Sequence, residues 1–158
     1  MSSLLLVDDN AQLLDFYKLV LEQAGHQVRT SETCAEAVAL LGASDPEIVI
    51  MDLRMPELED GLGLIRRLKE HTRPAGKRPM KVVVISGWVE DLLNAPEKGS
   101  VDRVLAKPVR MEVLLRSISE LALLAFLCLA AARPLVTHVT NAPLASPYNE
   151  VNAQSERA

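Results

Sequence analysis

Residues 48–61 read IVIMDLRMPELEDG, and this stretch carries the clearest signal of how the chain folds. Four consecutive apolar residues end at Asp52, a short loop follows, and Asp60 stands where a side chain can cap a helix. A continuously apolar run is typical of a strand covered on both faces, because a strand with one wet face alternates instead. The stretch therefore predicts a buried strand, a loop and a helix.

The same alternation extends in both directions along the chain. Short apolar or β-branched runs occupy residues 4–7, 27–30, 48–51, 82–85 and 104–106. Amphipathic segments separate them, and this rhythm is typical of βαβ units with a parallel sheet. The sequence thus predicts an α/β fold built on five parallel strands.

The first two helices have recognisable ends. Asn10 is expected to cap the first helix, and Gly25 lies just past its end. Thr33 with Glu36 three residues later resembles a capping box for the second helix, and Gly42 is expected to end it.

The later connections carry residues that disfavour helix. Gly61 and Gly63 weaken the first turn of the third helix by up to about 1 kcal/mol each, so packing must supply the difference. Pro96 removes a backbone donor from the fourth segment, residues 89–98, which we expect to be short or broken. The fifth helix begins after Pro108 and is expected to be the longest.

Composition limits the classes of function. The chain has 158 residues, 49% of them apolar, and a formal net charge of −4. A globular domain follows, and the weak negative charge disfavours direct binding of nucleic acid. The N-terminus has no basic region followed by a long apolar run, so we expect no secretory signal and a cytoplasmic location.

Polar residues follow the apolar runs at four places. Asp8 and Asp9 follow the first run, Asp52 the third, Ser86 the fourth and Lys107 the fifth. The carboxyl ends of parallel strands lie on one edge of the sheet, where open α/β sheets bind ligands. We therefore expect these five residues to converge there.

Three converging carboxylates repel one another unless a cation neutralises them. Mg²⁺ suits this role, because it prefers oxygen ligands and is commonly held by one or two carboxylates together with phosphate oxygens. Lys107 supplies a positive charge for a phosphoryl oxygen and Ser86 a hydroxyl, while an aspartate can itself be the nucleophile. The chemistry indicated is phosphoryl transfer onto a carboxylate.

Four motifs in order carry a family resemblance: LVDDN at 6–10, MDLRMPELEDG at 51–61, VISG at 84–87 and AKP at 106–108. Together they resemble the receiver domain of two-component response regulators over about residues 3–120. The resemblance implies a flavodoxin-like, doubly wound (βα)5 three-layer sandwich with parallel sheet order 2-1-3-4-5.

The resemblance also implies roles for the residues at the sheet edge. Asp52 matches the phosphoacceptor, which takes a phosphoryl group from a histidine of a sensor histidine kinase or histidine phosphotransfer protein. Asp8 and Asp9 match the acidic pair that binds Mg²⁺, and the backbone carbonyl of Arg54 matches a further metal ligand. Ser86 and Lys107 match the hydroxyl and the ammonium group that meet the phosphoryl group. Pro108 follows a peptide bond that is often cis in this family.

Two positions depart from the family pattern on the output side, the part of the surface through which a receiver is expected to contact its downstream partner. Val104 stands where the family often has a tyrosine or phenylalanine that changes rotamer on activation, and valine has no ring to move. Pro96 interrupts the neighbouring helical segment. Trp88, just after Ser86, is open to three interpretations: an anchor for a partner, a lid over the site, or a packing residue.

The chain is expected to divide into a receiver domain at 1–120, an apolar extension of the fifth helix at 121–136, and an irregular polar tail at 137–158. Residues 121–132 carry no polar side chain except a thiol, so this segment needs a cover. A homodimer is favoured over cover by the tail, and contact with a membrane is disfavoured because the run is shorter than the roughly 20 residues of a membrane span.

Three functions are compared. The favoured one is a stand-alone receiver that signals through protein contacts and is not an enzyme, because only about 38 residues follow Glu120. A haloacid dehalogenase-type phosphatase is disfavoured, because Arg54 stands where those enzymes have an acid two residues after the nucleophile. The third is a receiver-like interaction module that no longer uses phosphorylation.

Overall fold

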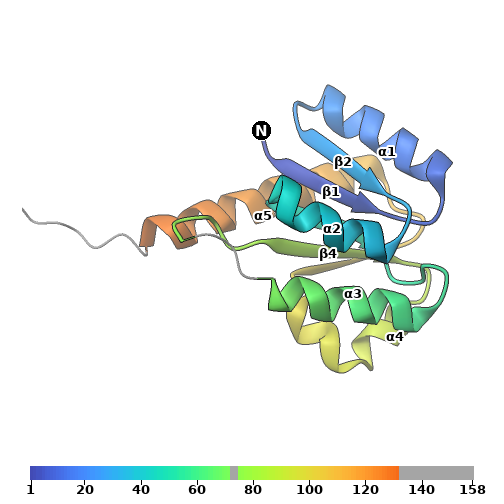
Figure 1. Ribbon diagram of the computed structural model, residues 1–158. Helices are drawn as coiled ribbons and strands as arrows, with labels where there is room; N and C mark the ends of the chain where they lie inside the picture. Colours follow the sequence, from blue (N-terminus) through green and yellow to red (C-terminus); the bar gives the residue numbers. More distant parts are fainter. Residues whose placement is uncertain (72–74, 132–158) are drawn as a thin grey trace, which may run out of the picture.

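The computed structural model describes residues 1–71 and 75–131, with side chains described to residue 127. Strands and helices alternate along the chain (Figure 1). In order they are β1 (Ser3–Val7), α1 (Ala11–Gln23), β2 (Gln27–Ser31), α2 (Cys34–Ser44), β3 (Ile48–Asp52), α3 (Leu58–Glu70), β4 (Lys81–Ser86), α4 (Val89–Leu93), the 3-10 helix η1 (Pro96–Ser100), β5 (Arg103–Ala106) and α5 (Met111–Ala131).

The five strands form one parallel sheet in the order β2-β1-β3-β4-β5. Leu4 pairs with Val28 on one side and with Ile48 on the other, and every pairing in the sheet is parallel. The α/β class and the strand order expected from the sequence are confirmed. All five carboxyl ends consequently lie on one edge.

Alternate residues of the central strands build two cores, one on each face of the sheet. Leu5, Val49 and Val84 pack with buried residues of α2 and α3 on one face, where Leu92 of α4 also lies. Leu6 and Ile50 pack with α1 and α5 on the other face. A strand between two helical layers has no wet face, which explains the continuously apolar runs.

The first helix ends as expected, whereas the ends of α2 and α3 differ. The Asn10 side chain accepts a hydrogen bond from the backbone N–H of Leu13, and Gly25 follows the helix with φ of 87°. Gly42 does not end α2: the helix continues to Ser44, and Asp45 takes the left-handed conformation with φ of 42°. The helix ends after Ser44 because Asp45, and not Gly42, leaves the right-handed helical region.

In α3, Asp60 acts from inside the helix. Glu57 is the N-cap, and the Asp60 carboxylate accepts a hydrogen bond from the Glu57 backbone N–H at 3.4 Å. The expectation that Asp60 precedes the helix is therefore wrong by three residues. In a capping box the side chain at the third helical position accepts from the backbone N–H of the N-cap residue, and Asp60 occupies this position.

The fourth connection is broken, as expected. Helix α4 has five residues, and Pro96 begins η1 at a position where its missing N–H costs nothing. Two X-Pro peptide bonds are cis, Met55–Pro56 and Lys107–Pro108.

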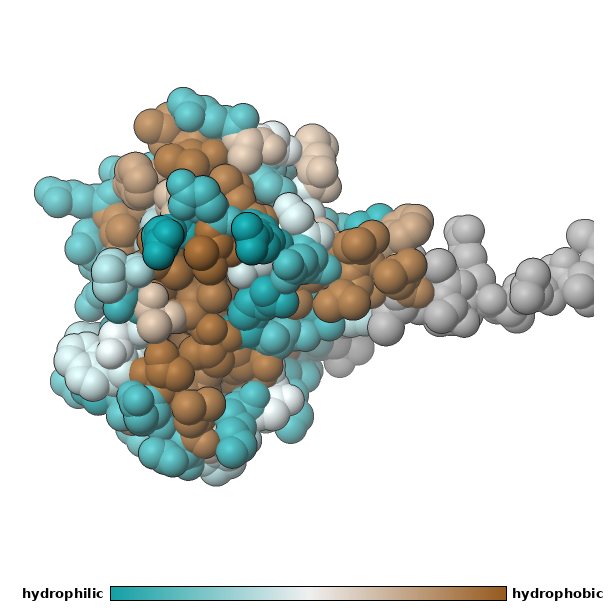
Figure 2. Space-filling model, turned by 180° about the vertical axis from the view of Figure 1, so that it is seen from behind, coloured by the Kyte–Doolittle hydropathy of each residue, from teal (hydrophilic) through white to brown (hydrophobic). Residues whose placement is uncertain are grey.

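Helix α5 extends beyond the body of the domain (Figure 1). Leu114, Ile118, Leu121 and Ala125 are buried on its inner side. Its outer side exposes four large apolar side chains near the end, and hydrophobic surface covers this projecting part (Figure 2). These residues are Leu123, Leu124, Phe126 and Leu127. Within residues 1–71 and 75–131, no helix combines the length and the apolarity needed to cross a membrane. The predicted tail at 137–158 lies outside the described residues.

Candidate functional site

Four strand ends bring polar side chains to one edge of the sheet. Asp8 and Asp9 directly follow β1, while Asp52 and Ser86 are the last residues of β3 and β4. Lys107 directly follows β5, and its backbone N–H donates to the carbonyl oxygen of Ser86 at 2.9 Å. Each of these strands ends at or directly before the polar residue that follows its apolar run, and that residue lies at the edge of the sheet. Five polar residues are thus brought to neighbouring strand ends.

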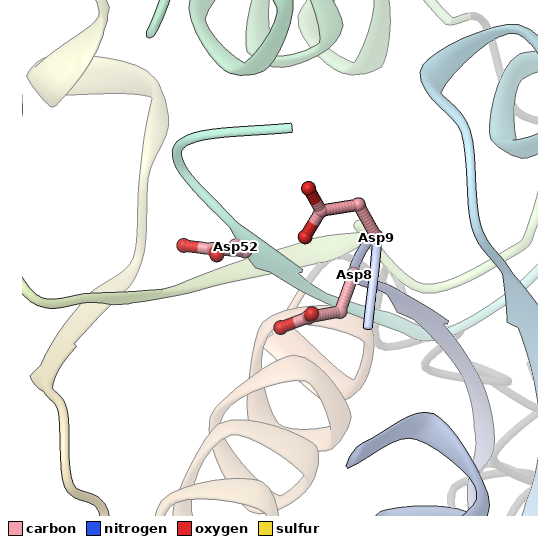
Figure 3. Close-up of side chains that lie close together, drawn as sticks. All are labelled: Asp8, Asp9 and Asp52. Atoms are coloured by element: carbon pink, nitrogen blue, oxygen red, sulfur yellow. The ribbon is translucent and has the colours of Figure 1, made fainter. Parts of the chain in front are cut away.

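The three carboxylates form a cluster. Asp8, Asp9 and Asp52 each offer a carboxylate oxygen, and these atoms all lie within 4.8 Å of one another. Figure 3 shows Asp8 and Asp9 reaching from the end of β1 toward Asp52. Asp8 is buried, the side chain of Asp52 is 13% exposed, and Asp9 faces solvent. A hard cation fits this donor set, since all three groups are oxygen ligands and one side is open to water.

Lys107 joins two of the carboxylates. Its Nζ donates to Asp52 Oδ2 at 2.8 Å and to Asp8 Oδ2 at 3.2 Å. Burial alone would lower the pKa of Lys107, but the hydrogen bond to Asp52 and the charges of Asp8 and Asp52 outweigh it, and the pKa is raised. Lys107 therefore keeps its positive charge at neutral pH, in the place where it partly neutralises the acids.

Asp8 is the carboxylate most affected by its surroundings. Burial raises the pKa of Asp8, and the backbone N–H of Asn10 and the charge of Lys107 oppose the rise, while the charge of Asp52 adds to it. The raised pKa means that the ionised form is held here at a cost. A divalent cation would remove that cost, which again fits a metal site.

The loop after Asp52 is held by close packing. Leu53 and Met55 are buried, and the backbone N–H of Leu53 donates to Asp52 Oδ1 at 2.7 Å. Helix α3 approaches so closely that a Cβ on Gly61 would lie 1.9 Å from the carbonyl oxygen of Leu53. Gly61 is thus required for the close approach of helix and loop, a role that its position in the sequence did not reveal.

The remaining two predicted residues are engaged elsewhere. Ser86 is buried on the strand beside Asp52, and its hydroxyl accepts a hydrogen bond from the backbone N–H of Trp88 at 3.0 Å. The side chain of Arg54 points to α4 and pairs with Asp91, Nη2 to Oδ2 at 2.6 Å. Asp91 was missed in the sequence, where nothing distinguishes it from a solvated acid in the first turn of a helix.

Comparison with known families and curated proteins agrees with this geometry. The family described as the response regulator receiver domain matches residues 4–119. The virulence transcriptional regulatory protein PhoP of Salmonella typhimurium is 37% identical over 131 residues, which are 77% of this chain and 55% of that protein. The transcriptional regulatory protein PhoP of Escherichia coli is 36% identical over 128 residues, 75% of this chain and 54% of that protein. The chain spans about half the length of these curated relatives.

Solved structures show the same fold. A response regulator receiver domain protein from Clostridium thermocellum superposes with a TM-score of 0.70 at 25% identity, covering 81% of this chain and 99% of that one. A CheY-like receiver domain protein from Methanospirillum hungatei gives a TM-score of 0.68 at 25% identity, covering 80% of this chain and 97% of that one.

Proposed function

The chain belongs to the response regulator receiver domain family, and from this premise we propose that it accepts a phosphoryl group on Asp52. The observation that carries the proposal is the environment of the Asp52 carboxylate. Lys107 Nζ lies 2.8 Å from one of its oxygens, and two further carboxylates lie within 4.8 Å. This is a nucleophile with a fixed cation beside it and an oxygen-rich place for a metal ion.

The proposed donor is a phosphohistidine of a sensor histidine kinase or a histidine phosphotransfer protein. An Asp52 carboxylate oxygen attacks phosphorus, the phosphorus–nitrogen bond breaks, and its electron pair returns to the imidazole, which takes a proton from water. The Lys107 ammonium stays charged and donates to an oxygen of the transferred group. The Ser86 hydroxyl, on the neighbouring strand, supplies a second donor after it leaves the Trp88 N–H.

A Mg²⁺ ion would be held by Asp8, Asp9, Asp52 and the backbone carbonyl of Arg54. When bound, it neutralises charge on the phosphoryl oxygens during transfer. Asp9 contributes an exposed carboxylate, which water can replace at the ion. Asp8 contributes a buried carboxylate, which the Asn10 N–H and Lys107 hold in position.

Intact-protein mass spectrometry tests the proposal. Incubation with Mg²⁺ and acetyl phosphate should add one phosphoryl group to the native chain and none to Asp52→Asn. Asp15→Asn is the matched control, because Asp15 is an exposed acid on α1, and this variant should be phosphorylated like the native chain. Equal phosphorylation of Asp52→Asn and the native chain would refute Asp52 as the acceptor.

Two alternatives make different predictions. A phosphatase of the haloacid dehalogenase type needs an acid two residues after the nucleophile, and that position holds Arg54, whose guanidinium pairs with Asp91. Turnover of a phosphate ester beyond one equivalent would favour it. A phosphorylation-independent module would bind its partner equally well with Asp52→Asn.

The projecting end of α5 supports a proposed homodimer. Leu123 and Leu127 are one helical turn apart and are 59% and 53% exposed. When a second apolar face covers an apolar face of a helix, apolar surface is removed from water, and this favours association. The stand-alone organisation and the cytoplasmic location expected from the sequence stay predictions.

A further inference from the structure

Arg54, Asp91 and Trp88 form a cluster that joins the loop after Asp52 to the start of α4. Arg54 donates to a single carboxylate oxygen of Asp91 through Nη2 at 2.6 Å and through Nε at 3.0 Å. Its guanidinium carbon also lies 4.8 Å from the centre of the Trp88 ring, which is a cation–π distance. One side chain from the acceptor loop therefore holds both the N-cap residue and the first turn of α4.

The backbone of Arg54 is held in place, whereas its side chain is partly exposed and can change its partner. Leu53 and Met55 on either side are buried, and the backbone N–H of Arg54 points to Asp52 Oδ1 at 3.5 Å. The Arg54 side chain is 39% exposed. The ion pair is partly open to solvent, with the Asp91 side chain 25% exposed, so Arg54 can exchange Asp91 for another anion without leaving a fully buried charge unpaired.

Trp88 has a second attachment that ends at the same site. Its backbone N–H donates to the Ser86 hydroxyl at 3.0 Å, and its side chain is 59% exposed. Helix α4 has five residues, of which Leu92 alone is buried. The exposed Trp88 ring is thus held by Arg54, and the Trp88 backbone by Ser86; both Arg54 and Ser86 lie close to Asp52.

Phosphorylation of Asp52 would place a competing anion beside Arg54. A phosphoryl group carries nearly two negative charges at neutral pH and three strong acceptor oxygens, and arginine binds such groups through two donors at once. Asp91 offers one charge, and Arg54 uses one of its oxygens. Mg²⁺ and Lys107 neutralise most of the negative charge at the acceptor site, and the charge that the phosphoryl group adds is not fully balanced by them. This remaining negative charge attracts Arg54 away from Asp91.

We propose that Arg54, Asp91 and Trp88 form a latch that reports the state of Asp52 to α4. Before phosphorylation Arg54 holds Asp91 and the Trp88 ring; afterwards Arg54 turns to the phosphoryl group, and Trp88 and the first turn of α4 are released. The latch rests on the proposed phosphorylation of Asp52, and Arg54 acts in it as a positioning residue. It gives this chain a connection to the output side that does not need an aromatic residue at Val104.

Trp88 is the sole tryptophan of the chain, so its fluorescence reports the latch directly. Phosphorylation of the native chain by acetyl phosphate and Mg²⁺ should shift the emission maximum to the red and raise the quenching constant for acrylamide. Asp91→Asn should show both changes without a phosphodonor and little further change with one. Glu90→Gln is the matched control, because it removes a charge from the same turn at an exposed side chain, and it should behave like the native chain.

Intact mass measured on the same samples separates two kinds of failure. No phosphoryl group on Asp52 would overturn the proposed function and, with it, the trigger of the latch. Complete phosphorylation of Asp52 with unchanged tryptophan emission would overturn the latch and leave the proposed function standing. Equal emission and quenching for Asp91→Asn and Glu90→Gln before phosphorylation would also overturn it, because the ion pair would then have no hold on Trp88.

Discussion

At the scale of single residues, Asp8 shows how the candidate site lowers the stability of the fold. Its side chain is buried among charges, and burial raises its pKa above the ordinary value of 3.8. A carboxyl group with a raised pKa contributes stability below its unfolded pKa, and that contribution is lost as pH rises through the folded pKa. At neutral pH and without metal, ionised Asp8 therefore destabilises the fold.

Asp8→Asn should raise the free energy of unfolding at neutral pH in the presence of EDTA. The gain should shrink as the pH is lowered toward the acidic range, where Asp8 of the native chain becomes protonated. Urea unfolding at neutral and mildly acidic pH measures both effects. Asp9→Asn is the control, because Asp9 is exposed and its substitution should change stability by no more than about 0.5 kcal/mol. A lower stability of Asp8→Asn at neutral pH would contradict the argument.

The same variant tests the metal site. Mg²⁺ binds the folded state alone in this scheme, so a concentration one hundred times the dissociation constant should stabilise the native chain by about 2.7 kcal/mol. Asp8→Asn should lose most of this increase, because the metal ion loses a charged ligand. Thermal unfolding with and without Mg²⁺ shows the difference, and an equal response of both chains would argue against Asp8 as a ligand.

At the scale of elements, α3 contains two glycines with opposite roles. A methyl group on Gly61 would lie 1.9 Å from the Leu53 carbonyl oxygen, whereas one on Gly63 would meet nothing closer than an Arg66 side-chain nitrogen at 3.7 Å. The first contact forces helix and loop apart, and the second is ordinary van der Waals contact. Substitution by alanine should therefore change the free energy of unfolding in opposite directions at Gly61 and Gly63.

Gly61→Ala should lower the free energy of unfolding by about 1–3 kcal/mol, the usual cost of overpacking, and should slow phosphorylation because Leu53 directly follows the proposed acceptor, Asp52. Gly63→Ala should raise stability by about 0.5–1 kcal/mol, the helix preference of alanine over glycine. Urea unfolding and the mass assay measure the two effects. Similar changes in both variants would show that the close approach of α3 is not what Gly61 provides.

At the scale of the whole molecule, the projecting end of α5 is the face proposed to join two copies of the chain. Burial of a leucine side chain contributes about 1.5–3 kcal/mol, and the exposed face offers Leu123 and Leu127 together. Sedimentation velocity over a wide concentration range should show a dimer for the native chain and a monomer for the double variant Leu123→Glu and Leu127→Glu. Leu19→Glu is the control, since Leu19 on α1 is 56% exposed and lies on another helix. A dimer that persists in the double variant would exclude this face.

The sequence alone determined the class of fold and the convergence of five polar residues at one edge. Both follow from local pattern: apolar runs specify strands covered on both faces, and the carboxyl ends of parallel strands share an edge. Every predicted strand agrees with the structure to within one residue. Two helix ends, at Gly42 and Asp60, differ from the expectation, because capping depends on which residue leaves the helical conformation.

Only the tertiary structure determined which side chains contact one another. The Arg54–Asp91 ion pair joins residues 37 positions apart, and the contact of Gly61 with the Leu53 carbonyl depends on how closely α3 packs. The raised pKa of Asp8 likewise depends on burial by the assembled sheet and helices. Distances between distant segments, and the exclusion of water between them, arise when the layers pack, so no local pattern in the sequence encodes them.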